Sequence, residues 1–403
     1  MPAELTETTK TIGIVAEYNP FHNGHLFQIN QIKKLIPNAV IISVMSGNLV
    51  QRGEFALFSK YERAGMAVLN GVDAVLELPP IWSCAPANIF AFASVYILHS
   101  LQIIDLICFG SECGDLELLN FAAEKTCSVE FNVKLNKYIK AHKNLSYPQN
   151  VAHAFLDLYG DEKADIHSIF TGSNNILAVE YLKALKKLDS RIIPMTIKRS
   201  GRDYNTVSAS YIRDYLLTNK GRPNELEEMK KYMPENSYNI LADLTKSEKF
   251  ADINNISSAV ISYITRLDVK EISRYAGTGG GEEYRIKKAV ENSFDYNSLI
   301  QNLEAKHGTS SSVRRMILNI FFGITREMQK QPPLYTNLLA ANQKGRDFLN
   351  TIRKKSQIQI ITKPASNDKY KNNIDMFIDN VYKLSLFNRD SEINAIKEKP
   401  YIY

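Results

Sequence analysis

Residues 12–25 constrain the fold of this chain more than any other segment, because an apolar run leads through a proline turn into a helical pattern. Ile12 to Ala16 are typical of a buried parallel strand, and Asn19-Pro20 favours an extended turn. The apolar spacing from Leu26 to Ile36 predicts a helix. The turn between them therefore lies where a strand meets the N-terminus of a helix.

His22, Gly24 and His25 flank this predicted helix N-terminus. Free backbone N–H groups and the helix dipole make such a terminus an anion site, and residues three apart can point at one phosphate. Two imidazoles here could stabilise charge that develops on an α-phosphate during nucleotidyl transfer. Surface or capping histidines are the structural alternative. The preceding strand and Gly24, which removes a Cβ where a phosphate would approach, favour the functional interpretation.

The first half of the chain alternates strand and helix patterns, which predicts an α/β fold with a Rossmann-like, doubly wound parallel sheet. We expect strands near residues 12–16, 40–45, 73–77, 103–109 and 191–197. We expect helices near residues 24–36, 59–70, 86–100, 115–125, 174–187 and 208–217. In such sheets ligands bind at the carboxyl ends of the strands, where His22, Gly47, Gly110 and Arg199 would lie.

After about residue 225 the pattern becomes mainly helical, as at residues 256–267, 285–291, 311–322 and 374–386. A break near Lys220-Gly221-Arg222-Pro223 separates the two patterns. We therefore predict a catalytic domain of residues 1–224 and a mainly helical domain of residues 225–403.

Cysteine usage and the N-terminus favour a cytoplasmic protein. The four cysteines show no Cys-x-x-Cys spacing, so free thiols in a reducing compartment are expected rather than disulfides or zinc. The polar segment Met1–Lys10 is neither a signal peptide nor a transit peptide. Polar residues interrupt the longest apolar region, residues 89–110, which favours a buried helix and strand over a membrane span.

Positive charge is concentrated in the second half. Residues 225–403 contribute +5 of the net charge of +6. Between Lys306 and Lys363, eleven basic residues face only two acidic ones. A one-signed stretch of this length favours a phosphate-rich partner over ordinary solvated helix faces.

An ordered set of motifs runs through the first half of the chain. They are Glu17–His25, Val44–Asn48 with Gln51–Glu54, Asn70–Asp73 with Glu77–Pro79, Phe109–Glu112, Asn174 with Ile176-Leu177, Thr196–Arg199 and Ser208–Arg213. This set closely resembles the bacterial tRNA(Met) cytidine acetate ligases, a family of the HxGH nucleotidyltransferase superfamily. Weaker similarity continues at Arg285–Lys287, Lys306 with Thr309, and Gly323-Ile324.

The resemblance implies an ATP-dependent ligase with ATP as substrate and Mg²⁺ as its companion ion. Acetate would be activated as acetyl-adenylate and transferred to N4 of the wobble cytidine of elongator tRNA(Met), giving N4-acetylcytidine. No DNA or membrane is implied as a partner. A nucleotidyltransferase that makes a small dinucleotide cofactor is one alternative, and a non-enzymatic RNA-binding protein with a vestigial nucleotide fold is another.

The resemblance also implies the site residues, with His22 and His25 catalytic. The ATP-binding set is Ile14, Val15, Glu17, Tyr18, Asn19, Pro20, Phe21, His22, Asn23, Gly24, His25, Gly110, Asn174, Lys198, Arg199, Ser208, Ser210 and Arg213. Structural alternatives remain for some of these residues. Gly110 could be a turn glycine, Asn174, Ser208 and Ser210 could be helix caps, and Lys198-Arg199 could be a solvated strand end.

Contacts to the RNA are expected from two segments, which contain Gly47, Asn48, Gln51 and Arg52 in the first half and Lys306, Arg314 and Arg315 in the second. A mobile surface loop is the alternative for residues 47–54. Glu17 and Glu77 could orient a histidine or hold Mg²⁺, or could be structural carboxylates. The metal ligands are not identified. Asn175 departs from the family, which usually has Asp there, and residues 307–312 are poorer in Arg than the family pattern.

Overall fold

The computed structural model describes residues 9–142, 145, 147–160, 169–199, 208–219, 223–304, 309–353, 355–362, 374–388 and 400–403. The described strands are β1 Thr11–Ala16, β2 Val40–Ser46, β3 Leu49–Val50, β4 Glu54–Phe55, β5 Ala74–Leu78, β6 Leu106–Ser111, β7 Ile193–Lys198, β8 Tyr335–Ala341, β9 Gln359–Ile361 and β10 Tyr401–Ile402. The five strands expected in the first half are β1, β2, β5, β6 and β7, so that prediction is confirmed.

The described helices of the first half are α1 Asn23–Leu35, α2 Lys60–Leu69, α3 Pro80–Ser83, α4 Ala87–Ser100, α5 Leu116–Cys127, α6 Val129–Ala141, α7 Tyr147–Tyr159, α9 Ser173–Lys187 and α10 Ala209–Thr218. Those of the second half are α11 Glu235–Lys246, α12 Ser257–Arg266, α13 Val269–Ile272, α14 Glu282–Glu291, α15 Tyr296–Glu304, α16 Ser310–Phe322, α17 Arg326–Lys330, α18 Gln343–Ile352 and α20 Ile374–Leu384, with 3₁₀ helices η1 Pro223–Lys231 and η2 Ile253–Ile256.

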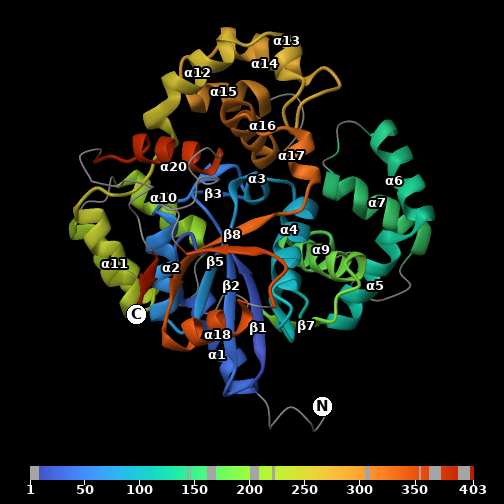
Figure 1. The fold of residues 1–403 in the computed structure, drawn as a ribbon. Coiled ribbons are helices and arrows are strands. Elements are labelled where there is room, and N and C mark those ends of the chain that lie inside the picture. The colour runs from blue at the N-terminus through green and yellow to red at the C-terminus, as the bar shows by residue number, and fades with distance from the viewer. Residues whose placement is uncertain are drawn as a thin grey trace.

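The main sheet has the strand order β10-β8-β5-β2-β1-β6-β7, and β9 pairs with the first residues of β8, Tyr335–Asn337. The strands from β5 to β7 along this order are all parallel, and β8 runs antiparallel to β5. A mostly parallel sheet needs helical crossovers on its faces, and Figure 1 shows helices on both sides of it. The expected α/β fold is confirmed.

The two faces of the sheet are covered by different hydrophobic cores because side chains alternate along each strand. Val40, Ile42 and Val44 of β2 pack with α4, α5 and α9 in one core. Ile41 and Met45 of the same strand pack with α1, α2, α10 and α11 in the other core. The doubly wound arrangement thus follows from near-continuous apolar strands that are buried on both faces.

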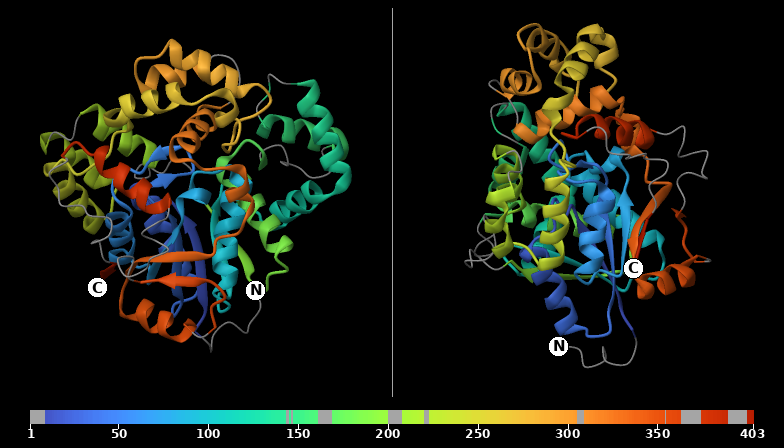
Figure 2. Two further views of the ribbon diagram at one scale, coloured as in Figure 1. Left: turned by 45° about the horizontal axis from the view of Figure 1, so that its top comes forward. Right: turned by 90° about the vertical axis from the view of Figure 1, so that its left-hand side faces the viewer.

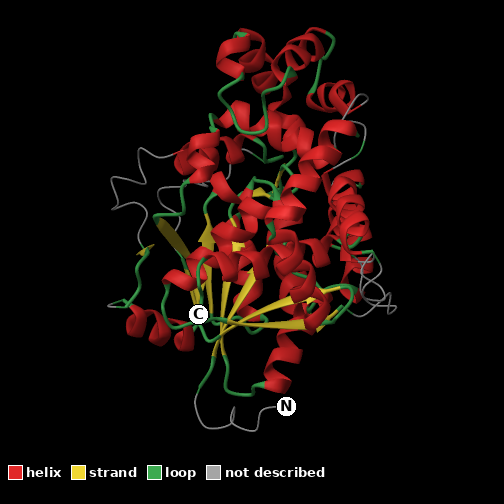
Figure 3. Cartoon of the chain, turned by 90° about the vertical axis from the view of Figure 1, so that its right-hand side faces the viewer, coloured by secondary structure: helices red, strands yellow, loops and turns green. Residues whose placement is uncertain are grey.

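Helices α12–α16 form a third core beyond the end of the sheet that lies opposite the N-terminus (Figures 1 and 3). Leu49, Phe55 and Cys84 of the first half belong to this core. Leu49 and Phe55 come from the short antiparallel hairpin β3–β4, so the hairpin joins the helical layer to the sheet. Figure 2 shows this layer above the sheet in both of its views.

The second half also supplies strands, which its mainly helical pattern did not predict. β8 pairs along β5, and Thr336 donates a hydrogen bond of 2.7 Å to the carbonyl oxygen of Glu77. The pairing works because β8 is buried nearly throughout, as a strand inside a sheet must be. The division into residues 1–224 and 225–403 stays a prediction, and part of its break, residues 220–222, lies outside the described residues.

All four cysteines are free thiols, as expected. Within the described ranges, no helix has the length and apolar composition that a membrane crossing requires.

Candidate active site

A cavity opens where β1, β6 and β7 end, between the N-termini of α1, α9 and α10 and the tip of the β3–β4 hairpin. Its lining includes most of the predicted ATP-binding residues: Val15, Glu17, Tyr18, Asn19, His22, His25, Gly110, Asn174, Arg199, Ser208, Ser210 and Arg213. Gln51 and Arg52, expected to contact RNA, line the same cavity. The carboxyl ends of parallel strands meet at one edge, which brings these distant segments together.

His22 and His25 are held by the start of α1. His22 is the N-cap residue, and its Nδ1 accepts a hydrogen bond of 3.0 Å from the backbone N–H of Gly24. The Nδ1 atom of His25 accepts a hydrogen bond of 3.2 Å from the backbone N–H of His22. The two rings lie with their centroids 4.0 Å apart. Because each Nδ1 is an acceptor, the proton of each neutral ring lies on Nε2.

Both imidazoles are neutral at physiological pH. Burial, together with the positive charges of Arg199 and Arg213, lowers the pKa of His22 to about 3. Burial and the neighbouring His22 ring hold the pKa of His25 well below its usual value. The histidines can therefore offer two Nε2–H donors without carrying charge of their own, and the cavity's positive charge comes from arginines.

Gly24 is required by the histidine itself. A Cβ at this position would lie 2.7 Å from Cε1 of the His22 ring, which folds back over the helix start. The sequence suggested that the missing side chain leaves room for an approaching phosphate, but the space beside Gly24 holds the His22 ring. A glycine between the two histidines thus allows His22 to cap the helix.

Arg199 and Asn174 form one wall of the cavity. The guanidinium of Arg199 donates a hydrogen bond of 3.1 Å to Oδ1 of Asn174. A Cβ at Gly110 would meet Cγ of Arg199 at 3.2 Å, so the aliphatic part of the arginine packs over the glycine. This contact gives Gly110 a steric reason that does not depend on a ligand.

Glu112 occupies the N-terminus of α9. Its carboxylate accepts hydrogen bonds from the backbone N–H groups of Asn174, at 3.1 Å, and Asn175, at 2.7 Å. The N-cap of α9 is Gly172, so Asn174 is not the cap residue. The side-chain oxygen of Asn175 accepts the backbone N–H of Glu112 at 2.9 Å. An asparagine here performs a structural task that needs only an acceptor oxygen.

Ser208 and Lys198 illustrate the alternatives left open by the sequence. Ser208 is the N-cap of α10, and its hydroxyl also lies 2.9 Å from the hydroxyl of Ser210. Both serines line the cavity, so capping and ligand contact coexist. Lys198 does not line the cavity, because alternate residues of a strand point to opposite sides. Its side chain packs against Gly114 instead.

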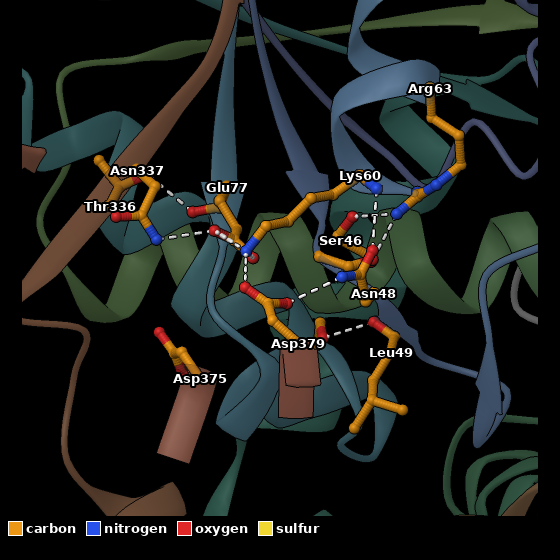
Figure 4. Close-up of polar contacts among 12 residues, drawn as sticks. Ser46, Asn48, Leu49, Lys60, Arg63, Glu77, Thr336, Asn337, Asp375 and Asp379 are labelled. Carbon is orange, nitrogen blue, oxygen red and sulfur yellow. Dashed lines mark hydrogen bonds and ion pairs between the residues drawn. The ribbon is translucent and has the colours of Figure 1, made fainter. Parts of the chain in front are cut away.

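A buried ion cluster fixes the base of the β3–β4 hairpin (Figure 4). Nζ of Lys60 lies 3.0 Å from Oε1 of Glu77 and 2.6 Å from Oδ2 of Asp379. Asn48 donates to Asp379 at 2.8 Å and accepts from the backbone N–H of Lys60 at 2.8 Å. Asn337 donates to Glu77 at 2.7 Å. We call Lys60, Glu77 and Asp379 the buried triad.

The buried triad explains several residues that the motifs contain. Glu77 is fully engaged by lysine and amide partners, which fits the structural alternative for this carboxylate. A Cβ at Gly47 would lie 2.3 Å from Oε1 of Glu77, and Arg63 donates to the carbonyl oxygens of Ser46 and Gly47. Gly47 and Asn48 are buried here, so the RNA contact expected for them stays a prediction without a surface to support it.

The tip of the hairpin contacts α16. Arg314 donates to the carboxylate of Glu54, and Arg315 donates to the carbonyl oxygen of Gln51 at 2.9 Å. Gln51 in turn donates its backbone N–H to Glu17 at 2.8 Å. The two arginines expected to hold RNA therefore have partners within the protein. Their RNA contact stays a prediction, and Lys306 lies outside the described residues.

The remaining predicted residues support the cavity from behind. Ile14 and Phe21 belong to the core beneath α1, and Asn23 binds the backbone of Lys231 and Tyr232. Pro20 lies buried in the same turn. Lining residues that the sequence analysis missed are Ala16, Gln28, Phe90, Phe109, Ser173, Leu177, Tyr181 and Ala209. Gln28 was accessible to prediction, because it follows His25 by three positions on one helix face.

The basic stretch of the second half does not form one surface. Arg314 lies in α16 of the helical layer and Arg326 begins α17 next to it, whereas α18, with Lys344 and Arg346, packs against β2 at the opposite end of the molecule (Figure 1). Nζ of Lys344 donates to the carbonyl oxygen of Ala39 at 2.6 Å. Some of the basic residues between Lys306 and Lys363 therefore form contacts within the protein.

No group of three or more His, Cys, Asp or Glu side chains that could hold a metal ion occurs within the described part of the chain.

Comparisons with known proteins agree with this geometry. The HIGH Nucleotidyl Transferase family model matches residues 9–398, and His22-Asn23-Gly24-His25 stands at the start of α1. A tRNA(Met) cytidine acetate ligase of Acetivibrio thermocellus is 36% identical over 88% of each chain. Ligases of the same name from Clostridium botulinum and Clostridium kluyveri are 35% and 33% identical, over 94% and 96% of this chain and 95% and 97% of theirs.

A solved structure agrees over nearly the whole chain. Thermotoga maritima TmcAL bound with alpha-thio ATP superimposes with a TM-score of 0.88 and 28% sequence identity, covering 98% of this chain and 99% of that chain. The chain therefore belongs to the tRNA(Met) cytidine acetate ligase family of HIGH nucleotidyl transferases.

Proposed function

We propose that this protein is an ATP-dependent ligase that acetylates N4 of the wobble cytidine of elongator tRNA(Met). The observation that carries the proposal is the pair of neutral histidines at the start of α1, inside a cavity lined by Arg199 and Arg213. The relatives that match almost the full chain bear the name of this activity. Adenylate formation needs donors for developing phosphate charge, and this cavity offers them.

In the first step, a carboxylate oxygen of acetate attacks the α-phosphorus of ATP. The bond from that phosphorus to the bridging oxygen of the β-phosphate breaks, and pyrophosphate leaves with the electron pair. Nε2–H groups of His22 and His25, with the positive end of the α1 dipole, would stabilise the negative charge on the α-phosphate oxygens. Neutral donors perform this task without a proton transfer, so the step does not require imidazolium.

Arg199 and Arg213, which both line the cavity, would bind the departing pyrophosphate. A guanidinium binds phosphate oxygens through two parallel N–H groups, and it stays charged at every relevant pH. Ser208 and Ser210 would add hydroxyl donors at the start of α10. Mg²⁺ would enter with ATP and neutralise part of the polyphosphate charge.

In the second step, N4 of the cytidine attacks the carbonyl carbon of acetyl-adenylate. The bond between that carbon and the phosphate oxygen breaks, AMP leaves, and the nitrogen loses one proton. An aromatic exocyclic amine is a poor nucleophile, so the mixed anhydride supplies the driving force that free acetate lacks. The hairpin tip lines the cavity, and α16 of the helical layer contacts that tip, so these two elements would receive the RNA, in a cytoplasmic setting.

Incubation of the protein with unmodified tRNA(Met), ATP, Mg²⁺ and labelled acetate tests this function. Mass spectrometry of the nucleosides should find label in N4-acetylcytidine, and mass spectrometry of ribonuclease fragments should place it at the wobble position only. The matched reaction without ATP should give none. Two outcomes would contradict the proposal. In one, labelled acetyl-adenylate forms but no label reaches the tRNA; in the other, the protein makes a dinucleotide from a mononucleotide substrate.

A further inference from the structure

Glu54, at the tip of the β3–β4 hairpin, lies between two arginines from distant parts of the chain. One carboxylate oxygen pairs with the guanidinium of Arg314 on α16. The other lies 3.7 Å from NH2 of Arg213 on α10. The Glu54 side chain is 26% exposed, so these charges are only partly screened by solvent.

Arg213 faces the cavity with few other constraints among the described residues. Its NH1 donates a hydrogen bond of 2.9 Å to the carbonyl oxygen of Asn19, and its side chain is 10% exposed. Asn19 and Arg213 both line the cavity beside His22, whose pKa the arginine lowers. The direction of this guanidinium is thus fixed by one carbonyl oxygen and one carboxylate.

The Glu54 side chain is itself fixed from the side of α16. Gly53 has a positive φ of +75°, and a Cβ there would lie 2.5 Å from the backbone nitrogen of Arg315. The hairpin tip therefore rests directly on the helix. Arg315 adds its hydrogen bond to Gln51, the residue at the other side of the turn.

We infer that Glu54 is a positioning residue that orients Arg213 toward the phosphates and links that orientation to the docking of α16. The inference rests on the proposed function, because it assigns Arg213 to pyrophosphate. The carboxylate has no contact with the reacting atoms. It acts through Arg213, whose placement decides how well the leaving group is stabilised.

Removal of the negative charge of Glu54 should lower the turnover of ATP while leaving ATP binding nearly unchanged. A glutamine keeps the size of the side chain and one acceptor oxygen, so one of the two guanidinium groups loses its partner. A misplaced Arg213 stabilises the departing pyrophosphate less well, which lowers kcat. The affinity for ATP changes little, because the removal of a nearby carboxylate also lessens repulsion of the phosphates.

The experiment measures acetate-dependent exchange of labelled pyrophosphate into ATP, together with ATP binding by calorimetry and the melting temperature. Glu54→Gln should lower kcat of exchange by roughly tenfold to a hundredfold, with ATP affinity within about threefold and an unchanged melting temperature. The control Glu227→Gln removes an exposed carboxylate that pairs with Lys230 in η1. It should leave all three measurements unchanged.

A charge exchange distinguishes positioning from simple attachment of the hairpin. The double variant Glu54→Arg with Arg314→Glu restores an ion pair between hairpin and α16, but it sets a second cation beside Arg213. It should recover the melting temperature lost in Glu54→Arg alone without recovering exchange. Recovery of exchange in the double variant, or full kcat in Glu54→Gln, would overturn the inference alone. A wild type without acetate-dependent exchange would overturn the proposed function and this inference with it.

Discussion

The β3–β4 hairpin carries a charge cluster at each end, and the two differ in their exposure to water. At its base, the side chains of the buried triad are 0%, 0% and 3% exposed. At its tip, the side chains of Arg213, Glu54 and Arg314 are 10%, 26% and 34% exposed. Both clusters tie the hairpin to residues of the second half.

The difference assigns the two clusters different tasks. A buried charge that loses its partner cannot recover solvation, so the buried triad has a single arrangement and serves the fold. A half-exposed pair loses less when it is broken, because water replaces the partner. The tip can therefore respond to a ligand's phosphates, whereas the base cannot.

The largest effect is expected from Lys60→Met. This change leaves Glu77 and Asp379 side by side without a cation in a buried site, and it should lower the free energy of unfolding by about 3–5 kcal/mol. Urea unfolding followed by circular dichroism measures it. The exposed Lys230→Met is the matched control. A loss below about 1 kcal/mol would remove the contrast between base and tip.

His25→Ala concerns the cavity that the tip of the hairpin lines. We expect acetate-dependent pyrophosphate exchange to fall by about a hundredfold to a thousandfold, as for the loss of one transition-state donor. The melting temperature should change by only a few degrees. Exchange at the wild-type rate in a purified, folded variant would show that His25 has no role in the chemistry.

Substitution of both Arg314 and Arg315 by Glu tests whether these residues at the hairpin tip contribute only to RNA binding or also to adenylate formation. Because Arg314 pairs with Glu54 and Arg315 with Gln51, we expect exchange as well as tRNA acetylation to fall, exchange by roughly tenfold. Exchange assays without RNA and acetylation assays with tRNA separate the two effects. A variant that loses acetylation but exchanges normally would place both arginines in the RNA surface only.

The smallest effect is a pH dependence. His22 has a pKa of about 3 in the folded protein, below its unfolded value of 6.5. Between pH 6.5 and pH 3 the unfolded chain therefore binds a proton at His22 that the folded protein does not bind. The stability that this histidine contributes above pH 6.5 is lost as the pH falls toward 3. His22→Asn keeps a capping side chain and removes the titration.

The stability of His22→Asn relative to wild type should thus rise by at most about 1.4 kcal/mol per pH unit as the pH falls below 6.5. Unfolding curves at pH 7, 6 and 5 measure this difference. If the stability difference between the two proteins stays constant from pH 7 to pH 5, His22 binds its proton equally in the folded and unfolded states, and its pKa is not lowered by folding.

Local pattern was enough to predict the strands around the site and the helix start at His22. The spacing of apolar residues and the residues that form turns act over a few positions of the chain. They are therefore enough to predict β1, α1 and the carboxyl edge of the sheet. The site residues that local pattern placed at strand and helix ends, such as Asn19 and Arg199, do line one cavity.

Long-range pairing could not be predicted in this way. Lys60 and Asp379 are 319 positions apart, and Glu54 and Arg314 are 260 apart. Nothing in a single sequence states which lysine will neutralise which carboxylate. The direction of the Lys198 side chain could not be predicted either. A shift of one position along a strand decides whether a side chain points into the cavity or away from it.

β8 has a consequence for how the chain reaches its native state. β5 ends at Leu78, yet its neighbour in the sheet begins at Tyr335, so the edge of β5 has no strand to pair with until most of the chain has left the ribosome. Contacts of such sequence separation slow folding, and an open edge of apolar strand invites association with other chains. We expect nascent chains that stop before residue 335 to depend on chaperones, with native folding becoming possible only when β8 has been synthesised.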